Sequence, residues 1–202
     1  NTEFEKEEPI YSYLHNFPVQ MIFQERCVGT FDELLMKRAL GTDAMVAALF
    51  QITMILLTYQ KAFDFTHNDL HTNNIMYVNT SETHINYCFD NTWYRVPTHG
   101  RIFKIIDFGR AIYRFQDKVF CSDSFAPSGD AYSQYNCEPF FNESKPRLDP
   151  NYSFDLCRLG CSLYDFVTDD DEGATPPHIV SMGSKGNNEL SFNTLNPVDA
   201  LI

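Results

Sequence analysis

The longest apolar run in the chain, Ala44 to Leu57, is the feature that most constrains the fold. Two polar residues interrupt it, so a helix through this run is apolar nearly all round and has to be buried on most sides. Thr42 or Asp43 can cap such a helix, which we expect to reach about Phe63. The run is too short to span a bilayer. It therefore predicts a globular body built around one central helix.

Composition supports a packed core and excludes some partners. Hydrophobic residues make up 44% and aromatic residues 15% of the 202 residues, which favours one folded domain or one large lobe over disorder. The formal net charge of -12 disfavours nucleic acid and anionic membrane surfaces as partners. A nucleotide stays possible, because a metal ion can neutralise its phosphates locally.

Cysteine spacing and the first residues predict the compartment. None of the six cysteines forms a C-x-x-C pair, so we expect free thiols and no zinc site. The segment from Asn1 to Pro9 is acidic and polar, unlike a signal peptide. We therefore expect an intracellular, cytoplasmic protein without a membrane anchor.

Several shorter elements are expected around the central helix. Thr30 and Glu33 have the spacing of a capping box, which predicts a helix over Phe31–Leu40. Residues 79–100 are polar and rich in turn residues, with a possible strand over Ile85–Phe89, and residues 114–150 contain several prolines, so we expect an insertion and an irregular stretch. The remaining expected elements are strands over Val19–Gln24, Ile75–Val78 and Ile102–Ile106 and a helix over Asp155–Val167.

Three polar motifs stand next to these elements. His67–Asn74 fits H-x-D-x-x-x-x-N, Asp107–Gly109 reads Asp-Phe-Gly, and Asp155–Gly160 fits D-x-x-x-x-G. In this order the motifs resemble the eukaryotic-type protein kinase superfamily, over about residues 18 to 167. The divergent loops also resemble kinase-like proteins of large DNA viruses. That origin would place the protein in a host cell or a virion.

The resemblance implies a fold and a division of the chain. The expected fold class is α+β, a mostly α-helical kinase-like carboxyl-terminal lobe with a small β-hairpin sheet at the catalytic cleft. Gly29 is the first glycine, and Lys6 is the one lysine before the expected hinge, so the amino-terminal lobe is expected to be largely absent. The expected parts are residues 1–17 as an extension, 18–167 as the kinase-like domain and 168–202 as an acidic, then polar tail.

The resemblance also implies the catalytic and metal-binding residues. Asp69 matches the base that orients the incoming hydroxyl, and His71 stands where many kinases have a phosphate-contacting lysine. Asn74 and Asp107 match the two Mg²⁺ ligands, an amide oxygen and a carboxylate. Turn or cap formation is the structural alternative for each acidic or amide residue, and a hydrogen bond inside the loop is the alternative for His71.

Other residues match the nucleotide site and its support. Gln24 matches the gatekeeper and the backbone of Glu25 and Cys27 the adenine-binding hinge, while Met76 and Ile106 match the floor of the adenine site. A plain strand and ordinary core are the structural alternatives. His67, Gly109 and Asp155 match supporting positions, with an N-cap as the alternative for Asp155.

The functional expectation follows from this resemblance. The leading hypothesis is transfer of the ATP γ-phosphate to a protein Ser/Thr hydroxyl, with Mg²⁺ and ATP as cofactors and activity dependent on completion by an amino-terminal lobe. One alternative is a catalytically inactive kinase-like scaffold in a larger assembly, and another is a small-molecule kinase. Asn68 replaces the usual arginine of the motif, which leaves phosphorylation-dependent switching without its usual residue.

Overall fold

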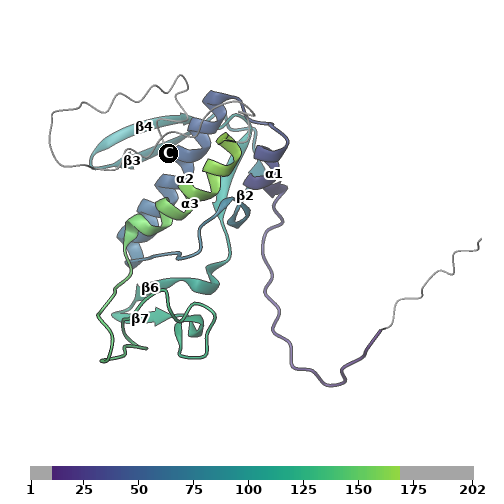
Figure 1. The fold of residues 1–202 in the computed structure, drawn as a ribbon. Coiled ribbons are helices and arrows are strands. Elements are labelled where there is room, and N and C mark those ends of the chain that lie inside the picture. Colours follow the sequence, from purple (N-terminus) through teal and green to yellow (C-terminus); the bar gives the residue numbers. More distant parts are fainter. Residues whose placement is uncertain (1–10, 169–202) are drawn as a thin grey trace, which may run out of the picture.

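The computed structural model describes residues 11–168 of the chain. The body is built from two long helices, α2 (Thr42–Phe63) and α3 (Tyr152–Thr168), a short helix α1 (Phe31–Met36) and three small sheets. Residues 11–28 leave this body as an extended arm (Figure 1). The predicted tail, apart from its first residue, and the first ten residues of the predicted extension lie outside the described residues.

Helix α2 is the predicted central helix and ends at Phe63 as predicted, but its N-cap is Gly41 instead of Thr42 or Asp43. At its carboxyl end the N–H of the C-cap Asp64 donates to the carbonyl of Gln60, and the left-handed backbone of Asp64 (φ 50°) ends the helix. One polar interruption of the apolar run, Gln51, is 1% exposed. Its side chain donates to the carbonyl of Arg101 (3.2 Å) and accepts from the N–H of Phe103 (3.1 Å). The buried amide therefore attaches the helix to a strand.

By length and composition alone, α2 could also cross a membrane. About a third of its most apolar window, 33%, is buried inside the body. Core helices of soluble proteins pass the same test, so this property does not assign a location.

The main sheet has the strand order β1-β2-β5 and is antiparallel throughout. Its strands are β1 (Gly29–Thr30), β2 (Ile75–Asn79) and β5 (Arg101–Ile105), of which the last two were predicted. Ile75 pairs with Ile105 at one end of this ladder, where both side chains are buried. At that end of the sheet, β2 follows the loop His67–Asn74 and β5 is followed by Asp107–Gly109.

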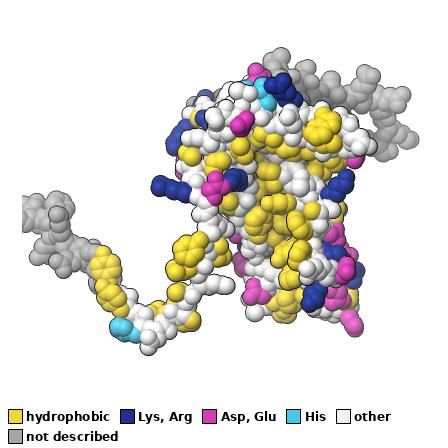
Figure 2. All heavy atoms as spheres, turned by 180° about the vertical axis from the view of Figure 1, so that it is seen from behind, with side chains coloured by type: hydrophobic (Ala, Val, Ile, Leu, Met, Phe, Trp, Pro, Cys, Tyr) yellow, Lys and Arg dark blue, Asp and Glu magenta, His cyan; other side chains and the backbone are white. Residues whose placement is uncertain are grey.

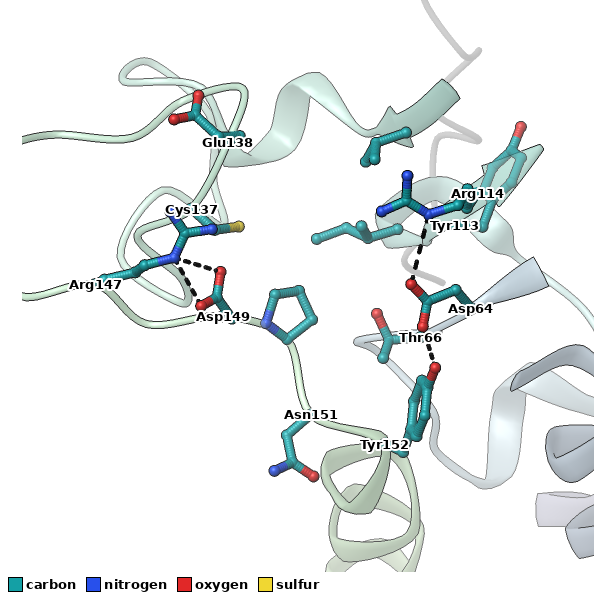
Figure 3. A pocket seen from close by; sticks show the side chains of 13 residues that line it. Asp64, Thr66, Tyr113, Arg114, Cys137, Glu138, Arg147, Asp149, Asn151 and Tyr152 are labelled. Carbon is teal, nitrogen blue, oxygen red and sulfur yellow. Dashed lines mark hydrogen bonds and ion pairs between the residues drawn. The ribbon is translucent and has the colours of Figure 1, made fainter. Parts of the chain in front are cut away.

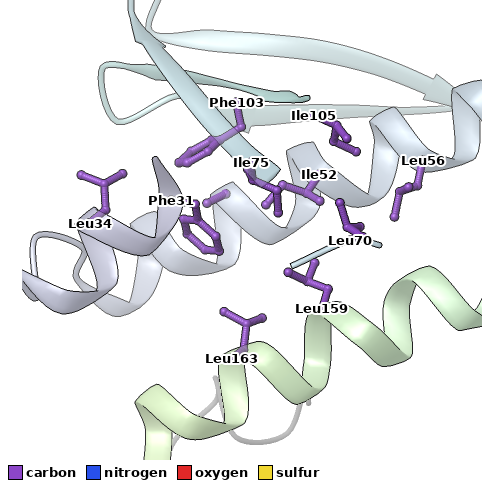
Figure 4. Packing of buried hydrophobic residues seen from close by; sticks show 11 residues of the cluster. Phe31, Leu34, Ile52, Leu56, Leu70, Ile75, Phe103, Ile105, Leu159 and Leu163 are labelled. Atoms are coloured by element: carbon purple, nitrogen blue, oxygen red, sulfur yellow. The ribbon is translucent and has the colours of Figure 1, made fainter. Parts of the chain in front are cut away.

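One hydrophobic cluster joins the helices to the main sheet (Figure 4). Leu159 and Leu163 of α3 face Ile52 and Leu56 of α2 across it. The other buried members come from α1, α2, the sheet and the loop between them: Phe31, Leu34, Ala48, Leu70, Ile75, Phe103 and Ile105. The cluster buries apolar side chains from residues distant in the sequence, and this burial stabilises the body.

The prediction for helix α1 is confirmed at the start of the helix and wrong at its end. The N–H of Glu33 donates to the Thr30 hydroxyl (3.1 Å), as the predicted cap requires. The helix ends at Met36 instead of Leu40, and Arg38 adopts a left-handed conformation with φ 48°.

Two hairpins form in segments that were predicted to be turn-rich or irregular, although the strand predicted over Ile85–Phe89 is confirmed as β3. Strands β3 (His84–Phe89) and β4 (Thr92–Pro97) form the insertion, and they meet at a tight turn whose central residues both have positive φ. Strands β6 (Ile112–Phe115) and β7 (Lys118–Cys121) form the second hairpin, again with a positive-φ turn. The first hairpin lies on α2, because Phe50 contacts the rings of Tyr87 and Tyr94.

The predicted fold class is therefore wrong in its main point. In residues 11–168 the structure has three α-helices of 6, 22 and 17 residues and three small antiparallel sheets, not a mostly α-helical kinase lobe. Strand pairing across two-residue turns converts the expected loops into sheets. The predicted strand over Val19–Gln24 is also wrong, since this segment is extended and exposed without a strand partner.

Candidate functional site

The candidate site forms around the loop His67–Asn74, which is held from below by helix α3. Asp155, in the first turn of α3, is 0% exposed. Its carboxylate accepts hydrogen bonds from the backbone N–H groups of His67 and Asn68, both at 2.8 Å. Burial raises the pKa of Asp155, while these two bonds act to lower it. The structure thus places Asp155 where a support for the loop was predicted.

His67 connects the loop to the segment that carries Asp107. Its ring is fully buried, with Nε2 at 2.9 Å from the carbonyl oxygen of Ile106. Its Nδ1 accepts from the N–H of Asp69 at 3.3 Å. These contacts together assign the ring proton to Nε2, because Nδ1 acts as an acceptor. His67 therefore holds the start of the loop and the end of β5 at a fixed separation.

The backbones of Asn74 and Ile106, the residue before Asp107, meet at the buried end of the main sheet. The N–H of Ile106 donates to the carbonyl of Asn74 (3.0 Å), one step beyond the Ile75–Ile105 pair. The Asn74 amide nitrogen donates to the carbonyl of Asp69 at 2.9 Å. With its nitrogen engaged in this way, the amide oxygen remains available as an acceptor or metal ligand.

Asp107, rather than the predicted supporting residue Gly109, has the left-handed backbone at this turn. Its φ is 61°, and its exposed carboxylate accepts from the N–H of Gly109 at 3.2 Å. The glycine itself has no positive φ, but a Cβ atom there would lie 3.1 Å from the Asp107 carboxylate. Gly109 therefore leaves room for the Asp107 side chain rather than supplying the turn.

His71 makes the hydrogen bond that was considered as its structural alternative. Its Nε2 lies 3.1 Å from the amide nitrogen of Asn74, which serves as the donor. The ring is partly buried in the loop. In this arrangement His71 orients Asn74 directly.

Two arginines that the sequence reasoning missed contact the carboxylate of Asp69. Arg110 Nη1 lies 3.4 Å from Oδ2, and Arg158 Nη2 lies 3.5 Å from Oδ1. Arg110 also pairs with Asp130 at 2.8 Å, and this hydrogen bond raises the pKa of Arg110 and lowers that of Asp130. The signal was available in part, since Arg110 follows Gly109 and Arg158 lies inside the D-x-x-x-x-G motif.

Asn68, which replaces the usual arginine, has a structural role of its own. It is 1% exposed and adopts φ 67°, a conformation that asparagine tolerates. Its amide donates to the carbonyl of Arg110 (2.8 Å), and the Tyr135 hydroxyl donates to its Oδ1 (2.8 Å). Burial raises the pKa of Tyr135 to about 12, which keeps this hydroxyl protonated. Asn68 thus joins the loop to the segment around Tyr135 without any phosphate.

The residues predicted to bind adenine lie on the arm and in or next to the main sheet. Gln24 and Glu25 are exposed on the arm, Cys27 is partly buried near its end, and Glu25 pairs with Lys104 of β5. Met76 is partly buried in β2, and Ile106 is partly buried just after the end of β5. Two cavities, of about 560 and 420 Å³, lie elsewhere, and none of these five residues lines either of them.

The site fits the metal-phosphate end of Mg-ATP better than the nucleoside end. Asp107 and Asn74 offer a carboxylate and an amide oxygen, which are ligands that Mg²⁺ prefers. Within residues 11–168 no group of three or more His, Cys, Asp or Glu side chains is placed to hold a metal. A magnesium ion there would therefore take its remaining ligands from water or from phosphate oxygens.

Two comparisons with known proteins found no match for the chain. No protein-family model matches the chain, and no curated protein matches it. The functional argument therefore depends on the geometry of the chain's own residues.

Proposed function

We propose that the chain is a phosphotransferase that moves the ATP γ-phosphate to a protein Ser/Thr hydroxyl. The observation that carries the proposal is the bonded arrangement of the loop. Asp155 holds the loop backbone, His67 ties the loop to Ile106, and the Asn74 amide closes the loop on the carbonyl of Asp69. Two bonds between segments distant in the sequence and one bond within the loop thus connect the Asp69 and Asn74 positions to Ile106, the residue before Asp107.

The chain's own residues would divide the work. The Asp69 carboxylate, 26% exposed, would orient the incoming hydroxyl and accept its proton. Asn74 and Asp107 would hold Mg²⁺, and bound Mg-ATP would supply the phosphoryl group and neutralise its charge. The predicted hinge residues line neither of the two described cavities, so we expect further surfaces for the nucleoside to come from outside the described residues or from a partner.

The test measures Mg-ATP binding and transfer with the full chain. Titration calorimetry gives the affinity for ATP with Mg²⁺ and with EDTA, and a mixed protein substrate reports phosphoserine and phosphothreonine. Asp107→Asn should abolish magnesium-dependent binding, whereas Asp69→Asn should leave binding intact and lower transfer by about 10²- to 10⁴-fold. Asp117→Asn, in the exposed turn between β6 and β7, is the matched control and should change neither.

The chain could fail this test in an informative way. Absence of magnesium-dependent ATP binding in the wild-type chain would contradict the phosphotransferase proposal. Binding and transfer that persist at full strength in Asp107→Asn would contradict the assignment of the metal ligand.

A second candidate is a catalytically inactive assembly protein, which two observations favour. The Asp69 carboxylate is already occupied by two guanidinium groups. The arm at residues 11–28 also exposes large apolar side chains, among them Tyr13 (82% exposed) and Phe23 (88%). Figure 2 shows hydrophobic side chains along this arm, outside the body. An exposed apolar segment of this kind is suited to contact with a partner. Loss of ATP binding together with a defined complex formed through the arm would favour this function.

A further inference from the structure

A cavity of about 560 Å³ lies beside the start of the candidate catalytic loop (Figure 3). One wall is formed by Asp64, Thr66 and strand β6, with Tyr152 beside Asp64, and the facing wall by lining residues between Cys137 and Pro150. A volume in the range of about 300–1,000 Å³ is typical of small-molecule sites. The cavity is separate from Asp69, Asn74 and Asp107, none of which lines it.

Thr66 presents an unpartnered polar atom to this cavity. The residue is 2% exposed, and Thr66 Oγ1 is the buried side-chain polar atom that lacks a hydrogen-bond partner within the described part of the chain. Its backbone is fixed by a reciprocal pair of bonds with Ile112, at 2.8 and 3.0 Å. In Figure 3 the side chain points into the space between the two walls. A buried hydroxyl without a partner is costly, so a partner from outside the chain is expected there.

The charged groups around the cavity are already matched to one another. Arg114 pairs with Asp64 (3.7 Å), and Arg147 Nε donates to both carboxylate oxygens of Asp149 (3.0 and 2.8 Å). Glu138 is exposed, and its carboxylate is turned away from the cavity in Figure 3. The cavity therefore presents no unmatched inward charge that would select an ion.

The rest of the lining is largely apolar. Ile112, Val119 and Pro150 supply aliphatic surface, and Tyr113 and Tyr152 supply aromatic rings. Apolar walls contribute affinity in proportion to the area that they bury, while a single hydrogen-bonding group fixes orientation.

We propose that this cavity binds a small, uncharged and largely apolar organic molecule that reaches Thr66 with one hydroxyl or carbonyl group. The inference goes beyond the proposed phosphotransferase function and does not depend on it. Since Thr66 immediately precedes His67, the ligand would lie against the backbone that enters the candidate catalytic loop.

The test uses two probes of equal shape, p-cresol and p-xylene, which differ by a hydroxyl in place of a methyl group. Their affinities for the full chain are measured by NMR titration. The wild-type chain should bind p-cresol about five- to tenfold more tightly, the ratio expected for one net hydrogen bond. In Thr66→Val the ratio should fall to about one, because a methyl group replaces the hydroxyl.

Two further variants locate the site and control for folding. Thr66→Ser keeps the hydroxyl and should keep the preference for p-cresol. Val119→Trp fills the cavity from a side chain that is 50% exposed, so it should weaken both probes without disturbing the core.

Three results would overturn the proposal. These are equal affinity of the two probes in the wild-type chain, a preference that survives in Thr66→Val, and no binding of either probe, which would mean that the cavity holds water alone. If Thr66→Val does not fold, loss of the preference in Thr66→Ser would count equally against the proposal.

Discussion

The hydrogen bonds from the loop backbone to Asp155 should contribute measurably to the free energy of unfolding. The two carboxylate oxygens of Asp155 accept the N–H groups of His67 and Asn68 at 2.8 Å in a fully buried position. Asp155→Asn keeps the shape but offers one acceptor oxygen in place of two, so one buried N–H faces an amide NH₂ group. Leaving a buried donor unsatisfied costs about 1–3 kcal/mol.

The loss of stability in Asp155→Asn is partly offset, because the substitution removes the buried negative charge of the native carboxylate. Burial raises the pKa of Asp155, so the ionised group carries a desolvation cost that the neutral amide avoids. We therefore expect Asp155→Asn to lower the free energy of unfolding by about 2 kcal/mol. For a chain of this size that corresponds to a fall in Tm of about 4–8 °C.

Urea denaturation followed by circular dichroism measures this difference, and amide hydrogen exchange locates it. The amides of His67 and Asn68 should exchange faster in the variant, because one of them loses its acceptor. Asp149→Asn is the matched control, since Asp149 forms an exposed pair with Arg147 and should change stability by less than about 1 kcal/mol. A variant as stable as the wild-type chain, with unchanged exchange at both amides, would refute the proposed support of the loop.

Three other perturbations test the fold around the site. Gln51→Leu should cost about 2–3 kcal/mol, because two backbone groups of β5 lose their buried partner. Gln116→Gly should stabilise the β6–β7 turn by about 0.5–1 kcal/mol, because Gln116 has φ 47°. The pKa of Tyr135 is raised from 10.0 to about 12 in the folded chain. The stability that the protonated Tyr135 hydroxyl contributes is therefore complete below pH 10 and is lost as the pH rises through 12. Tyr135→Phe should therefore lower stability at pH 7 by about 1 kcal/mol and reduce the alkaline loss.

Denaturant midpoints at fixed pH check the first two perturbations, and midpoints between pH 7 and 12 check the third. Unchanged stability in Gln51→Leu would mean that its amide does not secure β5. Destabilisation by Gln116→Gly, or an identical alkaline loss in Tyr135→Phe, would contradict the corresponding reasoning.

Much of the candidate site was predictable because its geometry is encoded locally. Each polar motif stands at the end of a strand or the start of a helix, where backbone N–H and carbonyl groups need partners. The Asp155 side chain supplies acceptors for the loop, and the Asn74 side chain closes it. The guanidinium contacts to Asp69 were missed, since no periodicity relates Arg110 and Arg158 to a residue so far away in the sequence.

The two hairpins show why the fold class was predicted wrongly. Strands β4 and β7 were read as parts of loops, because their sequences are short and flanked by polar residues. Each is stabilised mainly by its partner strand, and for β3–β4 also by contacts such as Phe50 with Tyr94. Strand preference depends on such cross-strand and packing contacts more than on the residues themselves.

By itself the sequence determined the central helix, the two main strands β2 and β5, and the identity of the polar residues at their ends. These features follow from apolar periodicity and from capping and turn chemistry, which act over a few residues. Tertiary structure alone decided the hairpins, the exposed position of the arm, the arginine pair at Asp69 and the cavity beside Thr66. These features depend on surfaces brought together from distant segments, whose packing and hydrogen bonding a local pattern does not contain.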